Sequence, residues 1–290
     1  SATAAAAAIG GVMNEQERKA GYDIHLGAAA NIASAPTGLL IPPSNTLITY
    51  SLVSGGTSVA ALFLAGYIPG ILWAIGCSIV ALIIAKKQGY KGSFEKFSFK
   101  ALGKALIEAL PALSLIIIVI GGIIGGVFTA TEGSVVAVVY SLILSMFFYK
   151  TINTKQLYDI FVESAEMSGI IVFLIGVSNI MSWVMAFTGI PQAVSDALLG
   201  FTDNPVIILL IMNIILLIVG TFMDVTPAIL IFTLIFLPIL ETFGIHPIHF
   251  GIIIVFTLSI GNITPPVGTT LFVGWRVANV SIDKVQPHPF

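Results

Sequence analysis

Long apolar stretches separated by short polar segments dominate the pattern along the chain. The apolar stretches cover about residues 24–54, 58–85, 109–128, 133–149, 166–187, 205–220, 228–240 and 250–275. Several of them reach the roughly 20 residues that a helix needs to cross a bilayer. Between them we predict a charged loop at 13–22, an amphipathic segment at 153–165 and an acidic surface segment at 189–204. The pattern predicts an all-α, polytopic membrane protein.

Composition supports the same class. Of the 290 residues, 57% are hydrophobic and 9% are charged, and the mean hydropathy is +1.04. Soluble domains carry roughly 25% charged residues, so an ordinary water-soluble domain is excluded. The formal net charge of -2 shows no bias towards nucleic acid. The single cysteine, Cys77, excludes a disulfide framework within the chain.

The distribution of charged residues predicts an orientation in the membrane. The segment 86–104 carries six lysines and one glutamate, so it is expected on the cytoplasmic side. Counting spans from there places Asp196 and Asp203 outside. Arg276 returns to the inside only if 205–240 is a re-entrant hairpin, and the charge pattern therefore favours such a hairpin.

Two Pro-Pro pairs interrupt apolar stretches and mark an internal repeat. Each opens a Pro-Pro-x-x-Thr motif, beginning at Pro42 and at Pro265, and each follows an apolar half-segment that ends in small or polar residues. The predicted topology makes the two copies enter the membrane from opposite sides. We therefore divide the chain into a first repeat at 1–85, a cytoplasmic lysine-rich loop at 86–104 and a second repeat at 105–290.

The breaks expose backbone groups that need partners. Proline lacks an N–H, and its ring clashes with the carbonyl four residues earlier. This frees the carbonyls of Gly38 and Leu39 in the first copy and of Gly261 and Asn262 in the second. A bound cation can satisfy such carbonyls, and the positive N-terminus of the following half-helix points at the same place. Two structural kinks are the alternative, but their matched flanks favour a binding site.

Asp224 is the only acidic residue in the middle of the predicted hairpin. A carboxylate at bilayer depth is costly, which makes it a functional candidate. The alternative is a capping role alone, although we expect Thr226 to cap the second half-helix with Pro227 at its first position. The candidate cation ligands are Gly38, Gly220, Thr221, Asp224, Thr226, Gly261 and Thr264. The candidate substrate-binding residues are Ser1, Thr3, Ser44, Asn45, Thr46, Val267, Gly268 and Thr269.

Two other function classes were weighed. An intramembrane hydrolase needs a nucleophile with a base, or a metal motif, and the sequence has neither; we assign no catalytic residue and no enzymatic activity. Broken helices also line channel filters. Channels usually build a pore from one re-entrant element in a symmetric oligomer, whereas here two different elements oppose each other. An ion channel therefore remains the less favoured alternative.

The motifs together resemble a known family. SATAAAAAIG, GLLIPPSNTLITYS, GGVFTATEGSVVAVVY, GTFMDVTPAIL and GNITPPVGTTLFV occur in an order similar to that of the large membrane subunit of TRAP (tripartite ATP-independent periplasmic) transporters. Ser-Asn-Thr after the first prolines also resembles the related divalent-anion/sodium symporters, which stay an alternative. Ala4–Ala8 departs from the polar or acidic residue of the family pattern. The resemblance implies preceding and following segments, so we expect the chain to be part of a longer protein.

The resemblance also implies a mechanism and partners. It implies an elevator-type transporter in the bacterial inner membrane that imports small organic acids, such as sialic acid or dicarboxylates, with Na⁺ as the coupling ion. The expected partners are a small four-helix membrane subunit and a periplasmic solute-binding protein. Hairpin tips and Pro-broken helices would hold the sodium and substrate sites.

Overall fold

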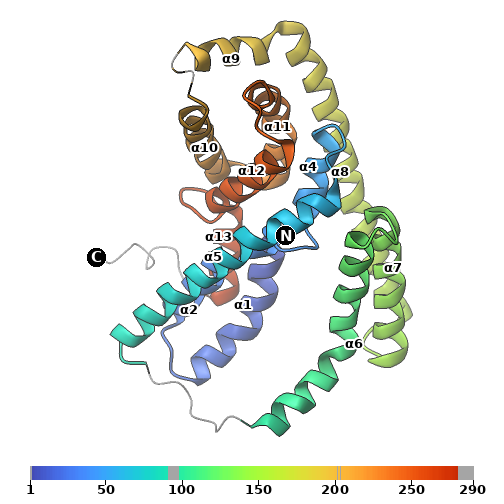
Figure 1. Cartoon of the computed structure of the whole chain (residues 1–290). Coiled ribbons are helices and arrows are strands. Elements are labelled where there is room, and N and C mark those ends of the chain that lie inside the picture. The colour runs from blue at the N-terminus through green and yellow to red at the C-terminus, as the bar shows by residue number, and fades with distance from the viewer. Residues whose placement is uncertain (1, 91–97, 201, 203, 280–290) are drawn as a thin grey trace. The chain divides into compact units, whose positions relative to one another are not determined.

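The computed structural model describes residues 2–90, 98–200, 202 and 204–279, and these form helices and no strands. The helices, shown in Figure 1, are α1 (Ala2–Lys19), α2 (Ile24–Ser34), α3 (Thr37–Leu40), α4 (Asn45–Val53), α5 (Val59–Lys87), α6 (Phe99–Ile124), α7 (Ala130–Ile143), the π-helix η1 (Leu144–Phe148), α8 (Thr154–Thr188), α9 (Ile190–Leu199), α10 (Pro205–Phe222), α11 (Val225–Thr242), α12 (Pro247–Asn262) and α13 (Thr269–Ala278).

Six of the described helices are long and apolar enough to cross a membrane. They are α5, most of α6, α7 continued by η1, the first part of α8, α10 and α11. The pair formed by residues 24–40 and 45–53 is bent by 45° and adds a broken span. The prediction of an all-α, polytopic membrane protein is confirmed.

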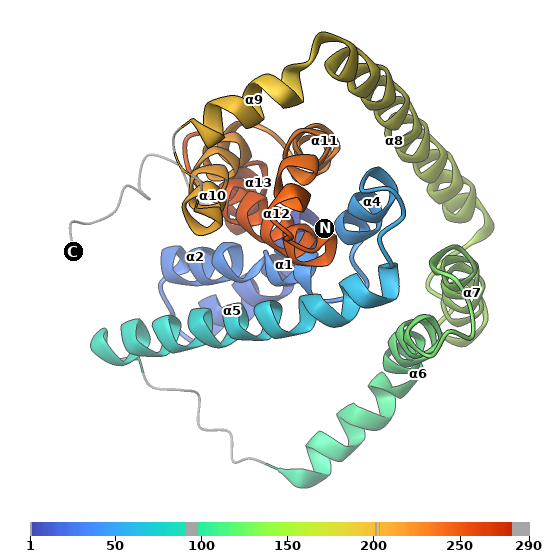
Figure 2. The same cartoon turned by 45° about the horizontal axis from the view of Figure 1, so that its top comes forward.

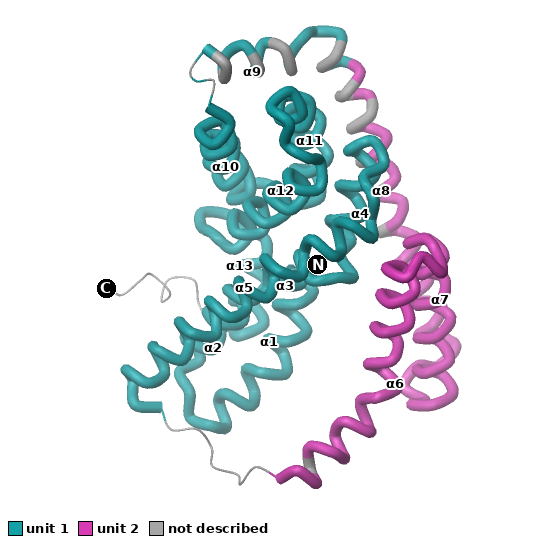
Figure 3. The backbone as a smooth tube through the Cα atoms, viewed as in Figure 1, with its two compact units in different colours: residues 1–93, 184–290 teal, residues 94–183 magenta. Residues whose placement is uncertain are grey.

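The chain divides into two compact units, coloured separately in Figure 3. Unit 1 contains residues 1–93 and 184–290, and unit 2 contains residues 94–183. Unit 1 therefore gathers the Pro-broken helices of both predicted repeats, together with the hairpin of α10 and α11. The division into repeats at 1–85 and 105–290 is a division by sequence and stays a prediction. Part of the lysine-rich loop, 91–97, lies outside the described residues.

The packing of α10 along α12 forms a tight contact inside unit 1, as Figures 1 and 2 both show. Two glycines meet there: a Cβ on Gly261 would lie 2.6 Å from the Cα of Gly220, so only residues without side chains allow this approach. On the same contact Thr257 Oγ1 donates a hydrogen bond to Asn213 Oδ1 at 2.5 Å. The close approach fixes the end of α10, and with it the hairpin tip, against the end of α12.

In unit 2, α6 and α7 form an antiparallel pair. A capping box starts α7: Glu132 N donates to Thr129 Oγ1, and Thr129 N donates to Glu132 Oε2 at 2.8 Å. The hydroxyls of Ser114 and Tyr140 lie 2.6 Å apart and tie the two helices together. Unit 2 contains none of the predicted site residues.

One sequence prediction of local structure was wrong. Residues 13–22 were predicted as a loop, but α1 continues to Lys19, because the segment contains good helix formers and Lys19 pairs with Glu15 one turn earlier at 2.7 Å. The chain turns only at Gly21, with a φ of 79°. The predicted surface segment at 189–204 contains the helix α9, a secondary structure that the sequence prediction had not specified.

Candidate ion and substrate site

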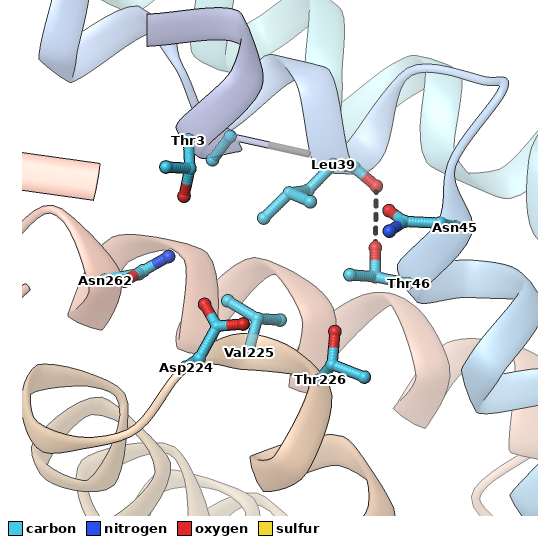
Figure 4. Close-up of a pocket in the computed structure, with 9 residues that line it drawn as sticks. Thr3, Leu39, Asn45, Thr46, Asp224, Val225, Thr226 and Asn262 are labelled. Carbon is cyan, nitrogen blue, oxygen red and sulfur yellow. Dashed lines mark hydrogen bonds between the residues drawn. The ribbon is translucent and has the colours of Figure 1, made fainter. Parts of the chain in front are cut away.

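The broken helices and the hairpin tip of unit 1 meet at one small cavity, shown in Figure 4. We call residues 41–44 the first break, residues 263–268 the second break, and residues 223–224 the hairpin tip. The cavity is lined by Ala2, Thr3, Leu39, Asn45, Thr46, Asp224, Val225, Thr226 and Asn262.

Several helix ends converge on this cavity. Helices α1, α4 and α11 present their first residues, which are Ala2, Asn45 and Val225. Helix α12 presents its last residue, Asn262, and α3 contributes Leu39 from its final turn. Helix N-termini favour anions, whereas C-terminal carbonyls favour cations. The cavity therefore combines positive and negative ends of helix dipoles, a combination suited to a cation together with an anion.

The first break is closed by its own side chains. Ser44 caps α4 by accepting a hydrogen bond from the N–H of Leu47 at 3.3 Å. The hydroxyls of Ser44 and Thr46 both donate to the carbonyl oxygen of Leu39, one of the carbonyls that the prolines free. Ser44 is fully buried and Thr46 is 2% exposed. Two hydroxyls therefore already satisfy this carbonyl.

The second break is closed by a local contact and by a contact with the hairpin. Gly268 precedes α13 with a φ of 40°, and no side chain caps this helix. Its N–H instead donates to the carbonyl of Thr221 at the end of α10, at 3.0 Å. Thr269 Oγ1 donates to Asn262 Oδ1 at 2.5 Å. The hairpin and the end of α12 thus hold the second break in place.

Asp224 occupies the N-cap position of α11, but its side chain makes no capping hydrogen bond. Its Oδ1 lies 3.3 Å from the hydroxyl of Thr269 instead. The carboxylate is directed away from its own helix towards the second break. The expectation that Thr226 caps this helix with Pro227 at the first position was wrong, because α11 already begins at Val225.

Backbone oxygens gather beside the same break. A Cβ on Gly268 would lie 2.9 Å from the carbonyl oxygen of Asn262 and 2.9 Å from that of Thr264. The missing side chain therefore leaves two carbonyl oxygens around one shared space. These carbonyls, the hydroxyl of Thr269 next to Gly268 in the chain, and the carboxylate of Asp224 beside that hydroxyl are all hard oxygen donors. Such a set fits a cation like sodium or calcium.

The size of the cavity sets what it can hold in this conformation. Its volume is about 20 Å³, and a single water needs roughly 10–15 Å³ on the same scale. A bare cation or one water fits, whereas an organic acid requires the surrounding elements to move apart.

Comparison with known proteins decides the family. Residues 1–288 match the family described as "Tripartite ATP-independent periplasmic transporter, DctM component". The chain belongs to this TRAP permease family. Members of this family are transporter permeases of the bacterial inner membrane and not enzymes, in agreement with the sequence prediction.

Three relatives illustrate this TRAP permease family. The chain is 53% identical to the "Uncharacterized protein YgiK" of Salmonella typhimurium, with 98% of this chain and 65% of the relative covered. It is 38% identical to the isethionate TRAP transporter permease protein DctMQ of Oleidesulfovibrio alaskensis, covering 99% and 45%. It is 35% identical to the sialic acid TRAP transporter large permease protein SiaM of Vibrio cholerae, covering 97% and 65%. The chain thus spans about two thirds or less of the length of these relatives.

The structure brings many of the predicted TRAP site residues together. Those that line the cavity are Thr3, Asn45, Thr46, Asp224 and Thr226. Behind it, Ser44, Thr221, Gly268 and Thr269 bond to lining residues or belong or bond to the second break. Gly220 and Gly261 contact each other where α10 meets the end of α12.

Four other predicted residues do not line the cavity or lie outside the described residues. Thr264 lies in the second break, where its hydroxyl donates to the carbonyl of Ile260 at 2.6 Å and its own carbonyl oxygen lies beside Gly268. Val267 is 38% exposed, and Gly38 in α3 is half-buried; neither lines the cavity. Ser1 lies outside the described residues.

Sequence reasoning missed the side chain of Asn262. Only its backbone carbonyl was considered, yet its amide is 2% exposed, lines the cavity and bonds two threonines of α13. A signal was present: Asn262 is the polar residue at the point where the repeat has Leu39 in the first copy. A polar residue inside an apolar stretch is a functional candidate in its own right.

Proposed function

We propose that this chain forms the translocation site of a sodium-coupled importer of small organic anions. The observation that carries the proposal is the convergence of the N-termini of α1, α4 and α11 with the ends of α3 and α12 on one cavity. Broken and re-entrant helices that meet in this way bind ions and substrates in secondary transporters.

Sodium is the proposed coupling ion, and Asp224 is its proposed charged ligand. A carboxylate in the middle of an apolar hairpin is costly without a counter-charge. The hydroxyl of Thr269 lies beside it, and the carbonyl oxygens of Asn262 and Thr264 flank the neighbouring Gly268. Because Leu39 O is already bonded by two hydroxyls, we place the cation beside the second break and not beside the first.

The proposed substrates are small organic anions. Among the described residues, no lysine or arginine lines the cavity, so an acidic group would be held by helix N-termini, by the hydroxyl of Thr3 and by the amide of Asn45. The named relatives act on sialic acid, a carboxylate, and on isethionate, a sulfonate. Either acidic group can accept hydrogen bonds from helix N-termini, and C4-dicarboxylates belong to the same class.

In the complete protein we propose an elevator-type cycle with two partners, a small four-helix membrane subunit and a periplasmic solute-binding protein. The small volume of the cavity supports a moving hairpin, because a substrate can enter only when the hairpin tip and the first residues of α1 separate. The re-entrant interpretation of the hairpin of α10 and α11 is part of this proposal.

The experiment uses proteoliposomes that contain the full-length permease with its membrane partner and its solute-binding protein. Uptake of sialic acid, isethionate and a C4-dicarboxylate is measured with an inward sodium gradient and with an equal potassium gradient. We expect saturable uptake of at least one substrate that requires sodium. Uptake that is indifferent to sodium, or single-channel currents across a planar bilayer, would exclude the proposed function.

A further inference from the structure

A series of polar side-chain contacts runs from the hairpin tip to the start of α1. Thr269 lies 3.3 Å from Asp224 and donates to Asn262 Oδ1 at 2.5 Å. Asn262 Nδ2 donates to Thr270 Oγ1 at 3.0 Å, and Thr270 Oγ1 lies 3.1 Å from Thr3 Oγ1. The series therefore joins the proposed cation ligand to a residue on the opposite wall of the cavity.

Counting protons gives this series a direction. A hydroxyl has one proton to donate, and the short distance commits that of Thr269 to Asn262. Thr270 is fully buried and accepts the amide N–H of Asn262. Because that N–H cannot accept, we assign the single proton of Thr270 to its other side-chain neighbour, Thr3. Asn262 is the only member of the series that both accepts at one atom and donates at another. Its amide therefore sets the orientation of both neighbouring hydroxyls.

We propose that Asn262 is a positioning residue that gives the site opposite polarity at its two ends, so that one end binds the cation and the other binds the anion. At the end near Asp224, Thr269 presents oxygen lone pairs. At the end near α1, Thr3 accepts the proton of Thr270 and turns its own O–H into the cavity. The proposal rests on the proposed sodium-coupled function and deepens it.

The geometry at the cation end fits this assignment. Sodium is close in size to calcium, whose oxygen ligands lie at about 2.3–2.6 Å. Two oxygens 3.3 Å apart, as in Thr269 and Asp224, then subtend roughly a right angle at one shared cation. Because the proton of Thr269 points to Asn262, no O–H is directed at the ion.

The geometry at the anion end is equally specific. Thr3 lies in the first turn of α1 and lines the cavity, so its O–H adds to the positive end of that helix dipole. In Figure 4 the hydroxyl of Thr3 and the carboxylate of Asp224 point into the same space from opposite sides. A donor there faces an acidic substrate group.

The decisive substitution is Asn262→Asp. The new carboxylate still accepts the proton of Thr269, but it cannot donate to Thr270. Thr270 then donates to this carboxylate instead, and Thr3 must donate to Thr270, so its O–H leaves the cavity. We expect that the NaCl concentration needed to stabilise the purified full-length variant against heating is no higher than for the wild type. We expect the KM of the transported acid, among sialic acid, isethionate and a C4-dicarboxylate, to rise about ten- to hundredfold.

The matched control is Asn213→Asp. Asn213 also accepts from a threonine of α12 and donates to a carbonyl, but it does not line the cavity. In this variant, the fold-change in the NaCl concentration needed for stabilisation and the fold-change in the substrate KM should differ by less than twofold. If Asn213→Asp also raised the substrate KM without raising the NaCl concentration needed for stabilisation, any carboxylate in these helices would have the effect. That result would overturn the proposal.

A double-mutant cycle separates orientation from simple charge repulsion. Thr3→Val alone should raise the substrate KM and leave the response to NaCl unchanged, and Thr3→Ser should restore the KM. In the Asn262→Asp background, Thr3→Val should have no further effect, because Thr3 no longer donates to the substrate. If the fold-changes in substrate KM of the two single variants multiplied in the double variant, charge repulsion and Thr3 would act independently. The orientation proposal would then fail.

Failure of this proposal is distinguishable from failure of the proposed function. If the wild type shows no sodium-dependent uptake, the proposed function fails. If the wild type transports but Asn262→Asp raises both the NaCl concentration needed for stabilisation and the substrate KM, only the positioning role fails. Should Asn262→Asp not fold, the pair Thr3→Val and Thr3→Ser still decides the anion end: an unchanged KM in Thr3→Val would overturn it.

Discussion

The two Pro-Pro breaks share a sequence motif but are held in different ways. In the first, the hydroxyls of Ser44 and Thr46 turn back to the carbonyl of Leu39, three residues of one continuous segment. The second has the matching local contact, from Thr269 to Asn262. It also depends on the hairpin, because Gly268 bonds to Thr221 and Thr269 lies beside Asp224. The first break is closed within itself, and the second depends on its neighbours.

This difference indicates that the two breaks have different roles, although their sequence motif is repeated. A break whose polar groups are satisfied locally keeps its shape whatever the rest of the protein does. A break whose polar groups bond to a separate hairpin changes when that hairpin moves or when its carboxylate is neutralised by a cation. We therefore expect substitutions in or behind the second break to alter ion dependence, and those in the first break to alter mainly stability.

The largest effect is expected from Gly261→Ala. The new Cβ would lie 2.6 Å from the Cα of Gly220, which forces α10 and the hairpin tip away from the second break. Overpacking of this kind costs about 1–3 kcal/mol, and sodium-dependent uptake should be lost. Uptake in proteoliposomes and the melting temperature in detergent measure both effects. Gly76→Ala is the control, because nothing lies within 4 Å of its added Cβ; a similar loss there would remove the argument from close packing.

The next effect is expected from Asp224→Asn. The amide keeps the shape of the side chain, but it removes the charge that balances a cation. Hydrogen bonds and contacts to charged groups contribute roughly 1.5–3 kcal/mol, so half-saturation by sodium should rise at least tenfold while the fold persists. The measurement is uptake against sodium concentration. Unchanged sodium affinity and transport would leave Asp224 with a structural role only. The second break would then no longer differ from the first in its dependence on the ion.

The sequence predicted much of this architecture because its signals are physically strong. Apolar length predicts spanning helices, and the absence of an N–H in proline predicts where α3 and α12 stop. Asp224 stood out because a charge in an apolar hairpin is costly. These arguments depend on one or two residues and on the solvent, so they need no knowledge of tertiary contacts.

The remainder required the fold. That Leu39 O is satisfied by Ser44 and Thr46 depends on side-chain rotamers within the break, which a motif does not specify. The role of the Asn262 side chain depends on the relative placement of α12 and α13. The helix in the charged segment after residue 12 was missed because charge was interpreted as a loop signal, although the spacing of Glu15 and Lys19 is helical.

A smaller effect is expected from Thr269→Val, compared with Thr46→Val at the matching position of the first break. Valine keeps the shape but removes a hydroxyl that we place next to the cation. One lost hydrogen bond or ligand is worth about 1 kcal/mol, which corresponds to a five- to tenfold rise in half-saturation by sodium. Thr46→Val should raise the sodium concentration at half-saturation less, because Ser44 still bonds the carbonyl of Leu39. The two titrations are run side by side, and equal shifts would argue that both breaks respond to the ion.

The smallest effect is expected from Ser44→Ala, and it concerns stability. Ser44 is fully buried, caps α4 and donates to the carbonyl of Leu39. Loss of an N-cap costs about 0.5–2 kcal/mol, which should lower the melting temperature by about 2–4 °C per kcal/mol in a protein of this size. Ser78→Ala is the control, because Ser78 bonds its own helix on an exposed surface of α5. Because the hydroxyl of Ser44 does not line the cavity, half-saturation by sodium and the substrate KM should stay within twofold of the wild type. A large rise in the substrate KM without a change in melting temperature would mean that the first break opens to the substrate during transport, and its self-contained closure would then describe only one state of the cycle.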